Sequence, residues 1–126
     1  MSTPNNRYEL EPENPPALKD MSVMAITAVM SSRLGPKLFA HAINAEPPEI
    51  LTDYMTGKQI PSEETELAMR GLAEVTDYLL NRDSPDVVRA IMVGQNPLLQ
   101  DKSPIELFNE GNGERVVQAA PNLLPD

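Results

Sequence analysis

The sequence contains no cysteine and no tryptophan, and aromatic residues make up only 4% of its 126 residues. The absence of cysteine excludes a disulfide framework, a thiolate zinc site and a thiol nucleophile. With so few aromatic rings, a core must be built from leucine, isoleucine, valine, alanine and the seven methionines. A chain of this length corresponds to one domain, or to two closely packed modules.

The chain also lacks a long hydrophobic run and a basic leader. The longest uncharged stretch near its start, Met21 to Ser32, is shorter than the ~20 apolar residues that a membrane span requires. Residues 1–20 are polar and proline-rich, which does not fit a secretion signal and is typical of a disordered arm. We therefore expect a cytoplasmic protein whose folded part begins near residue 21.

Positive charge is scarce, and the formal net charge is −9. Residues 61–126 carry five basic and twelve acidic residues, a net charge of −7, whereas residues 21–60 are neutral. Binding to a nucleic-acid backbone needs Lys and Arg, so only residues 21–60 could contact DNA. The acidic C-terminal half instead suits a partner with a basic surface.

Apolar residues recur at helical spacings from residue 21 to residue 120, and no alternating strand pattern appears. Helix starts are predicted at Ser62, Ser84 and Ser103, the last with a capping box to Glu106. The predicted fold is all-α: a compact helical bundle with a helix-turn-helix corner and a C-terminal module of short helices.

The spacing also predicts which helix faces are buried. In the first helix the expected buried face is Met21, Met24, Ala25, Ala28 and Val29. In the longest helix it is Leu67, Gly71, Leu72, Val75, Tyr78 and Leu79. Three members of the second set, Leu72, Val75 and Leu79, could serve either the core of one chain or an interface between copies.

Residues 34–61 have the layout of a helix-turn-helix, with two short helices, a break between them and a stop at Gly57. Acidic residues at the start of the second helix, Glu49 and Asp53 among them, would repel phosphate, so a scaffold corner without DNA binding is the alternative. If DNA binds, the expected contacts are Arg33, Lys37, Thr52, Lys58 and Gln59.

The C-terminal run from Gly94 to Ala120 contains an Asn96–Pro97 turn, a Ser103–Pro104 helix start, a stop at Gly111 and the pair Val116–Val117. In this order the motifs resemble the toxin-binding domain of Xre/MbcA/ParS-type antitoxins. The upstream segment, residues 34–61, is similar to the degenerate Xre-like helix-turn-helix of the same family. The resemblance covers residues 21–120.

The resemblance implies three regions: an arm at 1–20, an Xre-like helix-turn-helix and dimerisation region at 21–82, and a toxin-binding domain at 83–126. It implies an antitoxin that covers the active-site entrance of a RES-domain, NAD-degrading toxin and represses its operon by binding DNA. A homodimer or a larger hetero-oligomer with the toxin is expected. The implied toxin-binding residues are Asn112, Glu114, Arg115, Gln118, Asn122 and Asp126. Deleting residues 112–126 should abolish neutralisation while leaving helicity intact.

Three other classes of function remain open, and one of them is a bare structural domain in a larger phage or secretion assembly. A stand-alone helix-turn-helix regulator would use its C-terminal helices only to oligomerise. An enzyme has little support, because His41 is the single histidine and no nucleophile, acid or metal-ligand cluster accompanies it in the sequence. No cofactor or metal is expected.

Overall fold

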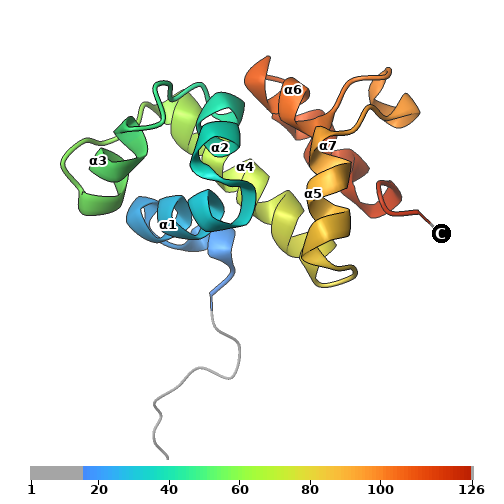
Figure 1. The fold of residues 1–126 in the computed structure, drawn as a ribbon, viewed down its shortest axis with the longest axis horizontal. Coiled ribbons are helices and arrows are strands. Elements are labelled where there is room, and N and C mark those ends of the chain that lie inside the picture. The colour runs from blue at the N-terminus through green and yellow to red at the C-terminus, as the bar shows by residue number, and fades with distance from the viewer. Residues whose placement is uncertain (1–15, 126) are drawn as a thin grey trace, which may run out of the picture.

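A computed structural model describes residues 16–125 (Figure 1), and every regular element in this range is helical. The all-α prediction is therefore confirmed. The helices are α1 (Val23–Leu34), α2 (Pro36–Ala42), α3 (Ile50–Thr56), α4 (Glu63–Leu80), α5 (Pro85–Val93), α6 (Pro104–Asn109) and α7 (Gly113–Ala119). Three short 3-10 helices join them: η1 (Leu18–Asp20), η2 (Pro97–Leu99) and η3 (Ala120–Asn122).

Local sequence signals set most helix boundaries. The hydroxyls of Ser22, Ser62, Ser84 and Ser103 each accept a hydrogen bond from a backbone N–H in the first turn of the following helix. Gly57 ends α3 in the left-handed conformation, with φ 80°, which costs glycine no steric strain. The predicted starts at residues 62, 84 and 103 are therefore confirmed.

The long helix α4 runs through the middle of the molecule, with α1, α2 and α3 around its first half and α5, α6 and α7 around its second (Figure 1). One continuous core joins both groups, and α2 also packs against α6. Methionines fill much of the centre: Met30, Met69 and Met92 are completely buried. Flexible thioether side chains suit a core with few aromatic rings, because they fill irregular gaps.

Two predicted helix faces need correction. The buried side of α1 consists of Ile26, Thr27, Met30 and Leu34, whereas Met24 is 47% exposed. In α4, Leu67 was expected inside but is 71% exposed. The wholly buried positions Leu72, Val75 and Leu79 belong to the core of a single chain, so they are not free to form an interface between copies.

The predicted arm at residues 1–20 is wrong for its last residues. Residues Leu18–Asp20 form η1, and the side chain of Leu18 is buried against the core. The guanidinium of Arg70 on α4 donates hydrogen bonds to the carbonyls of Lys19 and Met21, at 2.7 and 2.8 Å. Residues 1–15, which make up the rest of that predicted arm, lie outside the described range.

The predicted helix-turn-helix corner is not confirmed. Residues 43–49 separate α2 from α3, whereas the motif joins its helices by a turn of about 3–4 residues. Both helices pack on α1, and α2 also contacts α6. The two short helices, α2 and α3, therefore pack against α1 and are not a closely joined pair.

Candidate functional site

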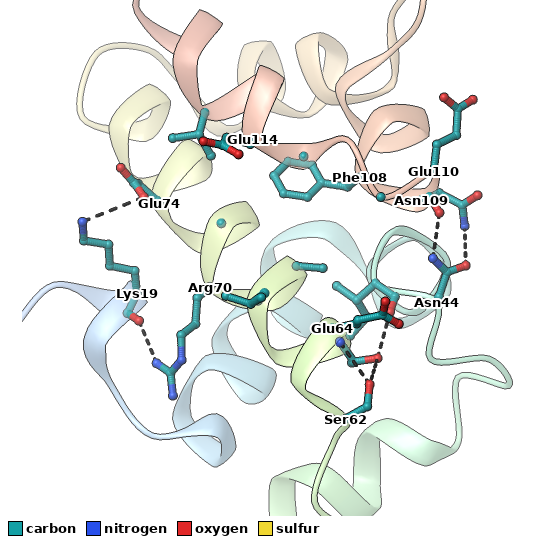
Figure 2. Close-up of a pocket in the computed structure, with 18 of the residues that line it drawn as sticks. Lys19, Asn44, Ser62, Glu64, Arg70, Glu74, Phe108, Asn109, Glu110 and Glu114 are labelled. Atoms are coloured by element: carbon teal, nitrogen blue, oxygen red, sulfur yellow. Dashed lines mark hydrogen bonds and ion pairs between the residues drawn. The ribbon is translucent and has the colours of Figure 1, made fainter.

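A groove of about 960 Å³ lies between α4 and the connection from α6 to α7 (Figure 2). The α4 side is formed by Glu64, Thr65, Leu67, Ala68, Arg70, Gly71 and Glu74, and the opposite side by Phe108–Gly111, Gly113, Glu114 and Val117. Lys19, Asp20, Ile43, Asn44 and Ser62 complete the lining. Four segments distant in sequence therefore meet at this groove.

The ring of Phe108 lies at the floor of the groove, between two glycines. A Cβ atom at Gly71 would stand 3.1 Å from Cε1 of this ring, and a Cβ atom at Gly113 would overlap the ring. Glycine at both positions therefore lets α4 and the start of α7 approach Phe108 closely. Phe108 itself is 4% exposed, so only a small part of the ring faces the groove.

The capping box at the start of α6 fixes the orientation of the helix that carries Phe108. The amide of Glu106 donates to the hydroxyl of Ser103 at 3.0 Å, and the amide of Ser103 donates to the Glu106 carboxylate at 2.9 Å. The backbone N–H of Ser103, followed by its hydroxyl, acts on the Glu106 carboxyl and lowers its pKa below the usual value of 4.5. The box is therefore strongest when Glu106 is ionised.

This box makes a pH-dependent contribution to stability. Because the folded pKa of Glu106 is depressed, its contribution is complete above the unfolded pKa and disappears as the pH falls through the folded pKa. We expect Glu106→Gln to be less stable than the wild type at pH 7 and to approach it as the solution is acidified. Ser103→Ala should cost about 1 kcal/mol at pH 7. Urea unfolding at several pH values measures both, and a Glu106→Gln deficit independent of pH would contradict this role.

Two asparagines hold the groove wall at the end of α6 (Figure 2). The amide of Asn44 donates to the backbone carbonyl of Asn109 at 2.7 Å, and the amide of Asn109 donates to the carbonyl of His41 at 2.7 Å. The two side chains also bond to each other at 2.9 Å. These three hydrogen bonds join the end of α2 to α6 and fix one end of the groove.

At the other end of the groove, the cations of the lining have intramolecular partners. Arg70 pairs with Glu66 at 2.8 Å and also donates to the η1 carbonyls described above. Lys19 lies 3.8 Å from Glu74. Neither Glu64 nor Glu114 has an ion-pair partner among residues 16–125. The groove therefore presents a net negative edge.

The predicted toxin-binding residues lie at one end of the molecule. Glu114, Arg115 and Gln118 on α7, together with Asn112 and Asn122 on either side of it, are exposed. Glu114 also lines the groove. Residues 114, 118 and 122 follow at intervals of four, which places them on the same side of the helical path. Asp126 lies outside the described residues.

The predicted DNA contacts lie at two places: Arg33 and Lys37 at the junction of α1 and α2, and Thr52, Lys58 and Gln59 on or just after α3. Arg33 at the end of α1 pairs with Asp77 on α4 at 2.6 Å. The end of α3, which precedes Lys58, lies against Met24 near the start of α1, about 13 Å from Arg33 along the helix. The side-chain amide of Gln59 bonds Asp53 at 2.7 Å. Lys37, Thr52 and Lys58 are exposed.

The single histidine, His41, lies near one carboxylate at the surface of the molecule. The Nδ1 atom of His41 is 3.8 Å from Glu46, and both side chains are exposed. No group of three or more His, Cys, Asp or Glu residues in residues 16–125 could hold a metal ion. Within the same range, no helix combines the length and apolar character needed to cross a membrane.

Comparison of the chain with protein-family models, with curated proteins and with solved structures finds no match.

Sequence reasoning missed most of the groove. It gave no role to Asn44, Arg70 or Asn109. One signal was present, namely Gly71 in the middle of a strong helix, where glycine costs ~1 kcal/mol relative to alanine unless packing requires it. The partner of Gly71, Phe108, is 37 positions further along the chain, beyond the reach of a local pattern.

Proposed function

We propose that this protein is an antitoxin that neutralises a RES-domain, NAD-degrading toxin by covering the toxin's active-site entrance with its C-terminal region. The observation that carries the proposal is the exposed polar face of α7, from Asn112 to Asn122, beside a groove with a negative edge. The order of motifs in residues 94–120 and their resemblance to the toxin-binding domain support it.

Electrostatics favour this kind of partner. A pocket that binds the anionic cofactor NAD is generally lined by positive groups, and an acidic surface is attracted to its entrance. Carboxylates outnumber basic residues in the C-terminal half, where the net charge is −7 for residues 61–126. The alternative of a stand-alone DNA-binding regulator has no comparable support, because residues 21–60, which hold its predicted contacts, carry no net positive charge.

Deleting residues 112–126 is not a clean test of this proposal. Val116 is completely buried, and Ala120 and Leu123 are 5% exposed, so the deletion removes part of the core as well as the proposed contacts. Loss of neutralisation after deletion could then result from unfolding. Substitutions of exposed side chains separate the two effects.

We expect Glu114→Lys to weaken the complex with the toxin by about tenfold, because it reverses a charge that faces a positive entrance. Asp86→Lys is the matched control, since Asp86 is an exposed carboxylate at the second position of α5, as Glu114 is in α7. The chain is co-expressed with the product of the adjacent open reading frame, and growth and co-purification are measured. Equal neutralisation by the two variants would overturn the assignment of α7 as the contact.

A further inference from the structure

We infer that the groove between α4 and the α6–α7 connection binds a cationic amphipathic helix of the partner protein, whose apolar side packs on Leu67 and Val117. This inference rests on the proposed function for the partner and adds the chemistry of the contact. The groove and its charge together carry it.

The apolar part of the groove is open to a partner. Leu67 lines it and is 71% exposed, although a leucine side chain gains about 1.5–3 kcal/mol when it is fully buried. Next to it, Ala68 and Gly71 leave the α4 surface low, and the half-buried Val117 continues the apolar surface on the other side. An apolar side chain can therefore enter between α4 and α7.

The groove has the length of a short helix. Its α4 side follows the positions 64, 67, 68, 71 and 74, which form one stripe of a helix. Ten residues of α-helix span about 15 Å, so this stripe can contact nearly three turns of an incoming helix. An amphipathic helix lying in an apolar groove is a common mode of recognition.

The charges at the edge select a cationic occupant. Of the groove's carboxylates, Glu74 and Glu110 pair with Lys19 and Lys102, whereas Glu64 on α4 and Glu114 on α7 have no ion-pair partner in residues 16–125 (Figure 2). Lysines or arginines beside the apolar face of a partner helix can reach these two carboxylates. A second copy of this chain, with its net charge of −9, would bring like charges together.

The test titrates the full chain into a fluorescently labelled peptide of about 18 residues, long enough to form a helix. The peptide has leucines on one helical face and lysines on the other, and a second peptide has glutamate in place of every lysine. We expect the lysine peptide to bind at least about tenfold more tightly, and the binding to weaken as salt is raised. Equal binding of both peptides, or none, would overturn the inference.

Matched variants locate the binding. Leu67→Ser should weaken the lysine peptide by about tenfold, whereas Leu98→Ser, at a 57% exposed leucine outside the groove, should not change it. Glu64→Gln should weaken it by about threefold. Glu63→Gln serves as its control, because Glu63 is exposed in the same first turn of α4 but does not line the groove. Equal effects within either pair would contradict binding at this site.

The outcomes distinguish this inference from the proposed function. If the chain neutralises the toxin but does not bind the lysine peptide, the groove proposal is wrong and the antitoxin proposal stands. If the peptide binds with the predicted pattern and no toxin is neutralised, the groove is a docking site and the antitoxin proposal is wrong. Concentration-dependent self-association abolished by Leu67→Ser would show a second copy as the occupant and overturn the inference.

Discussion

A chain that ends at residue 111 should lose most of its folding free energy. The deletion removes the completely buried Val116 and the almost completely buried Ala120 and Leu123, and it uncovers Phe108. The valine and leucine alone contribute about 3–6 kcal/mol of burial, which is comparable to the total stability of a small domain, about 5–15 kcal/mol. Thermal unfolding followed by circular dichroism measures the loss.

The control is a chain that ends at residue 124, which retains all three buried side chains and should unfold within a few degrees of the full chain. If the chain that ends at residue 111 keeps a cooperative transition near that of the full chain, α7 is not part of the core. In that case the expectation of intact helicity after deletion would be correct, and truncation would become a valid test of partner binding.

Gly113→Ala should destabilise the protein by about 1–3 kcal/mol, because its Cβ atom would overlap the ring of Phe108. Phe108→Ala should cost about 3–5 kcal/mol. With the ring removed, Gly113→Ala should become neutral or stabilise by up to ~1 kcal/mol, since alanine is the better helix former. Urea unfolding of the two single variants and the double variant gives the coupling energy.

The coupling in this double-mutant cycle is the informative quantity. Phe108→Leu provides a second background if Phe108→Ala does not fold. Additive effects of the two substitutions would show that glycine is not required at position 113 by its close contact with the ring. The account of the groove floor would then be wrong.

Local signals made the helices predictable from the sequence. Serine caps at residues 62, 84 and 103 and the stop at Gly57 act within a few residues, so their effect does not depend on the rest of the fold. The choice of buried face in α1 failed for a different reason. Almost every residue of that helix is apolar or small, so two stripes fit the helical period equally well and tertiary packing decides between them.

The groove could not be predicted because its parts are distant in the sequence. Arg70 stabilises η1 across about fifty residues, and Asn44 joins Asn109 across about sixty-five. Leu67 fits the period of α4 and was therefore predicted to be buried, but it lies at the edge where α7 leaves α4 uncovered. The exposed α7 residues were proposed as toxin contacts from the resemblance. The helical period around Val116 predicts that they are exposed, but it does not predict what they bind.

The central claim is that this protein acts by binding and neutralising a partner. Intracellular NAD, measured in cells that express the product of the adjacent open reading frame with and without this chain, tests that claim most directly. The account predicts that NAD falls when the neighbouring protein is expressed alone and returns to normal, together with growth, when the two form a complex. Unchanged NAD depletion in the presence of the folded chain would contradict it.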